Sequence, residues 1–215
     1  MMLPSAAQPH GSLRSCRGAA LALLTLLFAT GAEAGAWTVG ASAFVFAPPD
    51  DDVFLSPILE ADRGALHLEA RYNYEDLDTG SIFVGRTFQL GGDESATVVP
   101  VIGLVLGGTD AIAPGLKLDL AWRGLAFSTE SEVIVDLEDS EASFVYTWVE
   151  GTFGVTEGWR LGFVAQRAKT YETGLDIQRG PMIELSRAKG WLGFYWFNLD
   201  RPEDETFAFA AGYEF

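Results

Sequence analysis

Hydrophobic and polar residues alternate one by one along most of the chain after residue 35. The segment LHLEARYNYE (66–75) puts Leu66, Leu68, Ala70, Tyr72 and Tyr74 on one face and His67, Glu69, Arg71, Asn73 and Glu75 on the other. Successive side chains of a β-strand point to opposite faces, so such a strand has one apolar and one polar face. No helical period is sustained in this part of the chain. The pattern predicts an all-β fold.

Twelve segments of this kind follow one another. They span residues 36–46, 53–61, 65–75, 81–90, 96–106, 112–122, 125–137, 143–154, 158–169, 174–186, 190–199 and 206–215. Each is about ten residues long, the length of a membrane-spanning β-strand, and the remaining sequence suffices for short hairpin connections. We therefore predict twelve antiparallel strands in up-and-down order. Ten strands fit as well if two weak segments merge.

The connections between these segments fall into two sets that alternate along the chain. One set is acidic, as in FAPPDDD, EDLDTG, DLEDSE and LDRPEDE, and the other is shorter and keeps basic residues, as in ADRG and RAKG. Consecutive hairpins turn at opposite ends of the strands. The acidic connections are therefore expected at one end of the sheet and the short ones at the other.

The first 34 residues have the order of features found in a secretory signal peptide. Arg14 and Arg17 precede the apolar run AALALLTLLFA, and Ala32-Glu33-Ala34 offers a small-residue cleavage site. The run is shorter than the roughly 20 residues of a spanning helix, which disfavours a retained membrane anchor. We predict a signal peptide at 1–34 and a single domain at 35–215. The only cysteine, Cys16, then lies in the part that is removed.

The full chain of 215 residues has 14 basic and 30 acidic residues and a net charge of −16. Removing the predicted signal peptide leaves a domain that is still strongly acidic. Nucleic-acid binding needs a basic surface, so this composition excludes a nucleic-acid partner.

The C-terminal segment TFAFAAGYEF places Phe207, Phe209, Tyr213 and Phe215 on one face, and Phe215 ends the sequence. Together with the alternating segments, the signal peptide and the absence of further cysteines, this resembles bacterial outer-membrane β-barrel proteins. The resemblance implies a location in the outer membrane of a Gram-negative bacterium, with membrane lipids and lipopolysaccharide as surroundings. It also implies that periplasmic chaperones and the barrel-assembly machinery are partners, and that these four aromatic residues form the assembly signal.

A bilayer leaves no water for unpaired backbone groups, so a membrane-spanning sheet has to close on itself. We predict a closed antiparallel transmembrane β-barrel with its apolar faces toward lipid and its polar faces toward the lumen. The residues expected to line the lumen are His67, Glu69, Arg71, Lys117, Asp119, Arg123, Glu130, Glu132, Asp136 and Arg160. An excess of inward carboxylates favours a narrow, weakly cation-preferring channel for ions or small solutes.

Two other interpretations stay open at this stage. Ion pairs across the lumen would plug the barrel, which would then serve as a structural or adhesion element of the membrane. A soluble periplasmic barrel that binds an apolar ligand would show the same alternation with the two faces exchanged. The prediction for the membrane rests on the signal peptide, the terminal Phe215 and the aromatic residues near strand ends. Those expected in an aromatic girdle are Trp37, Trp122, Trp159, Trp191 and Phe215 at one end and Tyr72 and Tyr74 at the other.

Catalysis and cofactor binding find little support in the sequence. His67 is the only histidine after residue 34, and no serine is identifiable as its nucleophilic partner. The acidic stretches PPDDD and EDLDTG lack the spaced ligands of a calcium loop, so a solvated acidic rim that attracts divalent cations diffusely is the favoured interpretation. We expect no enzyme activity, no cofactor and no specific metal site.

Some residues fit the predicted barrel poorly. Pro57, Pro100, Pro114 and Pro181 fall inside predicted strands, where each should mark a bulge, a rim position or a wrong boundary. Arg86 and Arg179 fall on predicted lipid-facing sides and should lie near an interface. The segment WLGFYWFN (191–198) is apolar on both faces, so its orientation is undecided.

Overall fold

The computed structural model describes residues 35–49, 52–92, 94–170 and 176–215, so the predicted signal peptide lies outside the described residues. The strands are β1 (Thr38–Ala47), β2 (Phe54–Arg63), β3 (Leu66–Tyr72), β4 (Thr79–Arg86), β5 (Phe88–Gly91), β6 (Ser95–Gly107), β7 (Ala111–Trp122), β8 (Leu125–Asp136), β9 (Phe144–Thr156), β10 (Trp159–Thr170), β11 (Asp176–Arg187), β12 (Gly190–Phe197) and β13 (Thr206–Glu214). Two short 3₁₀ helices, η1 (Ser140–Ala142) and η2 (Pro202–Asp204), lie in connections. Among the described residues, no helix is long and apolar enough to cross a membrane.

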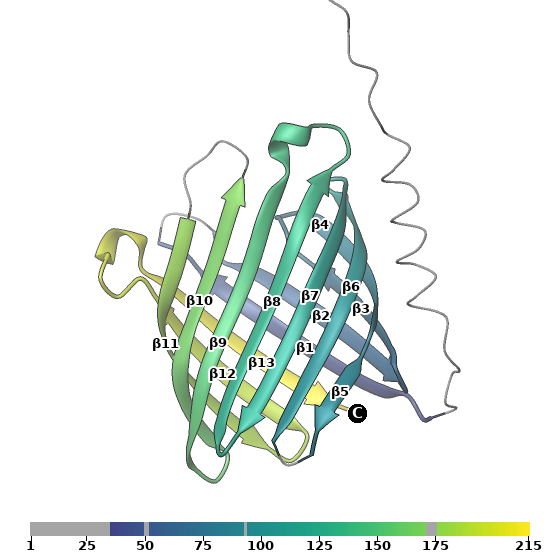
Figure 1. Ribbon diagram of the computed structural model, residues 1–215. Coiled ribbons are helices and arrows are strands. Elements are labelled where there is room, and N and C mark those ends of the chain that lie inside the picture. Colours follow the sequence, from purple (N-terminus) through teal and green to yellow (C-terminus); the bar gives the residue numbers. More distant parts are fainter. Residues whose placement is uncertain (1–34, 50–51, 93, 171–175) are drawn as a thin grey trace, which may run out of the picture. The chain divides into compact units, whose positions relative to one another are not determined.

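The strands form one closed antiparallel barrel (Figure 1). β4 and β5 both pair with β6 and not with each other; all other strands pair with their neighbours in the sequence, and β1 pairs with β13. β4 and β5 keep one register against β6 and act as one strand with a gap at Arg86–Thr87. The predicted twelve-stranded up-and-down barrel is therefore confirmed.

The two ends of the barrel differ. One end, here called the turn rim, carries the start of β1, the end of β13 and the short turns, such as Arg123-Gly124 between β7 and β8. The other end, the loop rim, carries the longer connections, including those with η1 and η2. The acidic connections that the structure describes all lie at the loop rim, as expected. In outer-membrane barrels, short turns are periplasmic and longer loops are extracellular.

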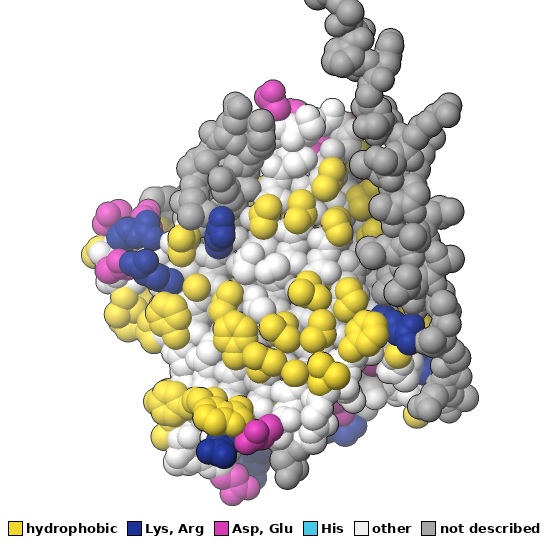
Figure 2. Space-filling view, viewed as in Figure 1, with side chains coloured by type: hydrophobic (Ala, Val, Ile, Leu, Met, Phe, Trp, Pro, Cys, Tyr) yellow, Lys and Arg dark blue, Asp and Glu magenta, His cyan; other side chains and the backbone are white. Residues whose placement is uncertain are grey.

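Apolar side chains cover the outside of the barrel, and charged ones are buried inside it. Leu68 and Phe163 are 37% and 52% exposed, whereas Glu69 is 4% exposed. Figure 2 shows hydrophobic side chains across the middle of one face, with charged side chains toward the edges of the view. An apolar exterior of this kind is the lipid-facing surface of an outer-membrane barrel, as the predicted location requires. A soluble barrel would need the opposite arrangement.

The four prolines lie within strands, and each stands where the pairing to one neighbouring strand stops. Pairing of β2 with β3 ends at Ile58, next to Pro57, and pairing of β11 with β12 begins at Met182, next to Pro181. Pro100 lies in the gap between β4 and β5, and Pro114 lies in a gap of the pairing between β7 and β8. Proline has no N–H to donate, so the hydrogen-bond ladder is interrupted at these positions.

The structure settles the orientation of β12. Tyr195 and Phe197 are buried inside the barrel, and Leu192 is exposed on the outside. Phe209 and Tyr213 of β13, and Phe215 directly after it, are exposed on the outside. Their role in assembly stays a prediction.

The aromatic girdle is present in part. Trp37, Trp122, Trp159 and Phe215 are exposed near the turn rim, and Tyr72 is exposed near the loop rim. Trp191 and Tyr74 instead point inward: Trp191 packs against buried residues of the lumen, and Tyr74 lies against Arg71. The prediction for these two residues was wrong. Arg179 lies near the loop rim, where it pairs with Asp200 of the β12–β13 connection, so it lies near an interface as expected.

Candidate functional site

Arg71 lies at the centre of a group of buried carboxylates in the lumen. Its guanidinium pairs with Glu69 of the same strand at 2.7 Å, with Glu75 at 3.2 Å and with Glu132 of β8 at 2.8 Å. It also pairs with Glu130 of β8. The Arg71 side chain is 0% exposed, so water cannot replace these partners. The ion pairs therefore join β3 to β8 through the interior of the barrel.

A second set of ion pairs continues this group toward the turn rim. Lys117 Nζ of β7 lies 2.6 Å from Glu60 of β2 and 3.0 Å from Glu69. His67 Nδ1 lies 2.9 Å from Asp62, and its Nε2 lies 3.3 Å from Glu69. We call this group the charged cluster; its members are Glu60, Asp62, His67, Glu69, Arg71, Glu75, Lys117, Glu130 and Glu132. Its carboxylates outnumber its basic groups.

Small residues on the intervening strands make room for the charged cluster. Gly85 of β4, Gly103 of β6 and Gly115 of β7 face inward between β3 and β8. A Cβ atom at Gly115 would lie 2.8 Å from Cγ of Glu132, and one at Gly103 would lie 2.4 Å from the Phe83 ring. Phe83 in turn lies under the guanidinium of Arg71, 4.3 Å from its ring centre, with Tyr74 at 4.4 Å. Both rings therefore add cation–π contacts to the ion pairs.

The opposite part of the lumen is aromatic. Phe44 of β1 lies at 5.8 Å from Trp148 of β9 and at 6.2 Å from Trp191 of β12, measured between ring centres. Tyr195 and Phe197 of β12 complete this aromatic wall, and Ala208 and Ala210 of β13 pack beside it. These aromatic residues were not predicted to face the lumen. The apolar character of both faces of residues 191–198 was the available signal.

Three cavities follow one another between the charged cluster and the aromatic wall. A cavity of about 730 Å³ opens at the loop rim, one of about 180 Å³ lies in the centre, and one of about 420 Å³ lies at the turn rim. Phe46 and Tyr74 line both the first and the second, and Ser42, Glu60 and Trp191 line both the second and the third. The cavities are therefore adjacent along β1.

Not all predicted lumen residues belong to the charged cluster. Asp119 and Arg160 line a separate cavity of about 340 Å³ near the turn rim, where Arg160 Nε donates a hydrogen bond to Thr152 Oγ1 at 2.8 Å. Asp136 lies at the loop-rim end of β8. One of its carboxylate oxygens accepts hydrogen bonds from the backbone N–H groups of Glu138 and Asp139.

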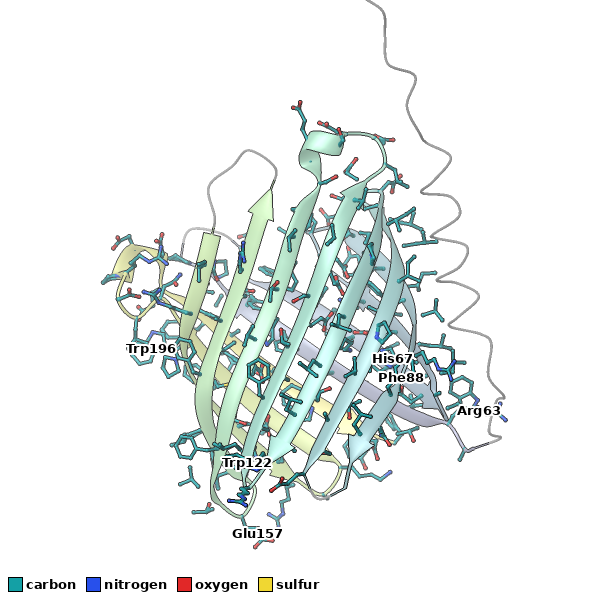
Figure 3. The ribbon with its side chains drawn as sticks, viewed as in Figure 1. Arg63, His67, Phe88, Trp122, Glu157 and Trp196 are labelled. Carbon is teal, nitrogen blue, oxygen red and sulfur yellow. The ribbon has the colours of Figure 1, made fainter. Side chains whose placement is uncertain are left out.

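Arg123 was wrongly predicted to line the lumen. It lies in the two-residue turn between β7 and β8 with a positive φ of 47°, and its side chain is 74% exposed. Its guanidinium lies over the ring of Trp122 and pairs with Glu94 at 3.4 Å. Figure 3 shows Trp122 and Glu157 at the turn rim. Because a tight turn directs its side chains away from the barrel axis, Arg123 belongs to the rim.

One group of residues in the charged cluster has the composition of a metal site. Glu60, His67 and Glu69 each offer a ligand atom, and these atoms lie within 4.8 Å of one another. Lys117 Nζ, however, lies within hydrogen-bond distance of both carboxylates. The ammonium group therefore stands where an ion shared by Glu60 and Glu69 would bind.

Comparison with known proteins identifies the fold. No protein-family model matches the sequence, and no curated protein matches it. Among solved structures, the chain matches the KdgM porin with a TM-score of 0.57 at 10% identity, over 82% of this chain and 99% of that one. The chain has the same barrel fold as this porin. The NanC porin matches with a TM-score of 0.54 at 10% identity, over 82% of this chain and 98% of that one.

A second KdgM structure, a complex with disordered oligogalacturonate, matches with a TM-score of 0.58 at 10% identity, over 83% of this chain and 99% of that one. Sequence identity this low means that the likeness concerns the course of the backbone alone. One barrel fold can host different lumen chemistries, so the activity has to be argued from the side chains inside this barrel.

Proposed function

We propose that this barrel is a narrow passage for small solutes that prefers cations. The observation that carries the proposal is the series of three adjacent cavities along β1, whose walls bear more carboxylates than amines. The carboxylates are Asp52, Glu60, Asp62, Glu69, Glu75, Asp76, Asp78, Glu130 and Glu214, and the amines are Lys117 and Lys189. Rings of carboxylates inside a pore favour cations and repel anions.

The central cavity sets the limit on solute size. At about 180 Å³ it is much smaller than the cavities at either rim, and the aromatic wall and the charged cluster bound it on two sides. A solute has to shed most of its water to enter, so charged wall groups act on it strongly. We expect a small conductance, and we expect polyanions such as oligogalacturonate to be excluded.

The proposal is tested by recording purified protein in planar bilayers under a KCl gradient. We expect the reversal potential to have the same sign as the equilibrium potential of K⁺. Absence of conductance, or a reversal potential with the sign of the equilibrium potential of Cl⁻, would refute the proposal.

Lys117→Met should raise the selectivity for cations. The substitution removes the amine nearest the central cavity and leaves Glu60 and Glu69 without their shared partner. We expect the K⁺/Cl⁻ permeability ratio to rise by about twofold or more, since each fixed charge in a narrow, poorly hydrated pore strongly changes the electrostatic energy of a passing ion. Lys189→Met is the control, and we expect it to raise the ratio less. The Lys189 side chain is half exposed in the turn after β11. An unchanged or lower ratio in Lys117→Met would contradict the assignment of the path.

A second candidate function has its own support. The charged cluster and the aromatic wall fill much of the interior, which favours a closed barrel that serves the membrane as a structural or adhesion element. Its acidic loop rim would then be the contact surface, with divalent cations bridging it to lipopolysaccharide phosphates. Binding to lipopolysaccharide that requires Mg²⁺, together with absence of conductance, would support this function over the passage.

We further propose that the protein is not an enzyme. The His67 ring contacts the carboxylates of Asp62 and Glu69. Neither residue carries a hydroxyl group that could act as a nucleophile. Insertion by the barrel-assembly machinery through the outward face of β13 is the proposed route to the membrane.

A further inference from the structure

We propose that the solutes of this passage are flexible alkyl amines with more than one ammonium group, the chemical class of 1,4-diaminobutane. This inference rests on the proposed function and names its substrate class. It is drawn from the two kinds of side chain that line the passage. In the central cavity, carboxylates line one side and aromatic rings the other, and both kinds of side chain also line the cavity at the loop rim.

Aromatic rings supply the surface for the alkyl part. At the loop rim, Phe46 and Phe54 stack at 5.0 Å, and Tyr74 and Tyr146 meet edge to face at 5.6 Å; all four line the cavity there. In the central cavity, the aromatic lining residues include Phe44, Trp148 and Trp191. Ring faces attract both methylene groups and ammonium ions, and desolvated rings do so most strongly. Hydrated inorganic ions gain little from such a wall.

Carboxylates supply partners for ammonium groups at every stage. Asp76 and Asp78 line the first cavity, Glu69 and Glu130 the second, and Asp62 and Glu214 the third. A short chain with an ammonium group at each end can keep one end paired while the other moves. A single small ion has to leave one carboxylate before it reaches the next. The arrangement therefore suits elongated cations with two or more charges.

Glu75 lines the loop-rim cavity, and one of its carboxylate oxygens lacks a hydrogen-bond donor in the part of the chain that the structure describes. Its Oε1 accepts hydrogen bonds from Arg71 and Ser81, whereas its buried Oε2 has no hydrogen-bond partner among the described residues. Glu75 is 92% buried, given its exposure of 8%, and it lines this cavity. Burial raises the pKa of Glu75, which lies in the connection after β3. An ammonium group beside Oε2 would favour the ionised form, as a nearby positive charge does.

Block of the K⁺ current by 1,4-diaminobutane tests the inference. Two comparison solutes test the contributions of charge and of methylene groups separately. The first, 1,4-butanediol, has a similar shape without charge, and the second, Mg²⁺, has the same charge without methylene groups. We expect 1,4-diaminobutane to halve the current at a concentration about tenfold below that of Mg²⁺, a ratio that one cation–π contact can supply. We expect no block by the diol. Equal block by diamine and Mg²⁺, or equal effects of diamine and diol, would overturn the inference.

Variants of two aromatic residues that line the passage test the aromatic contacts separately. Phe46→Leu and Trp191→Leu should weaken block by the diamine about fivefold to tenfold and leave block by Mg²⁺ unchanged. Phe209→Leu is the matched control, since Phe209 faces outward and is 55% exposed. Heat-modifiable migration on a detergent gel verifies that each variant has folded. If the wild-type protein prefers the diamine but both variants keep that preference, these aromatic side chains do not bind the diamine.

Calorimetric titration of detergent-solubilised protein separates failure of the inference from failure of the proposed function. Binding of 1,4-diaminobutane without any conductance would refute the passage and keep the amine site. A K⁺-selective conductance without binding or block by the diamine would keep the passage and refute the amine site.

Discussion

Arg71→Met is expected to lower the free energy of unfolding by about 3–5 kcal/mol, because it removes one partner of a buried ion-pair network. Four carboxylates, Glu69, Glu75, Glu130 and Glu132, would lose their shared guanidinium. The Arg71 side chain is 0% exposed, so water does not take its place. Methionine keeps an unbranched side chain but lacks the guanidinium, so the ion pairs and the cation–π contact with Phe83 are lost together.

Unfolding of Arg71→Met is measured by urea titration of protein reconstituted in lipid vesicles, with tryptophan fluorescence as the signal. Arg123→Met is the control. Its side chain is 74% exposed at the turn rim, and exposed ion pairs contribute about 0–1 kcal/mol. Similar losses in the two variants would show that Arg71 is not held in a buried network.

Leu116→Arg is expected to cost about 2–4 kcal/mol, the range for a cation on the lipid face near the bilayer midplane. Leu116 lies in the middle of β7, on the outer face of the barrel, and is 45% exposed. Its neighbour Lys117 points into the lumen, where it has two carboxylate partners. The two positions therefore test the orientation of the strand with side chains of similar length.

Leu137→Arg is the matched control for Leu116→Arg. Leu137 follows β8 at the loop rim and is 59% exposed, and a cation near the interface costs about 0–1 kcal/mol. Both variants are compared with the parent protein in the same vesicle titration. A barrel that faces water rather than lipid would show little cost for either substitution.

The fold could be predicted closely from the sequence because period-two alternation determines both the strands and their faces. The predicted segment 125–137 corresponds to β8 at 125–136, and 112–122 corresponds to β7 at 111–122. The prolines could be marked as exceptions but not explained. Their explanation needs the register: Pro100 and Pro114 stand at gaps of the ladder, which no local pattern reveals.

The charged cluster could be predicted only as a list of inward residues. Arg71 and Glu132 lie 61 positions apart, on strands that are not neighbours, so their contact depends on the small residues Gly103 and Gly115 between them. The aromatic wall escaped prediction for a related reason. Apolar residues in a barrel strand are read as lipid-facing, and Phe44 and Trp148 break that rule because they pack against each other inside.

Tyr74 and Arg123 show how predictions fail at strand ends. Tyr74 lies two residues beyond the end of β3, so the alternation that holds up to Tyr72 no longer fixes its direction. Arg123 lies one residue beyond β7 in a turn with positive φ. Periodicity carries no information once the extended backbone ends.

Thiol modification at Ser42 tests the path and its charge together. Ser42 lines both the central and the turn-rim cavity, and Cys16, the only cysteine of the full sequence, lies in the predicted signal peptide. In Ser42→Cys, we expect a trimethylammonium methanethiosulfonate to react and reduce the K⁺ current, much faster than the sulfonate reagent of opposite charge. Ala43→Cys, on the lipid-facing side of the same strand, should stay unmodified. Modification of Ala43→Cys but not of Ser42→Cys, or faster reaction of Ser42→Cys with the anionic reagent, would contradict a cation path inside this barrel.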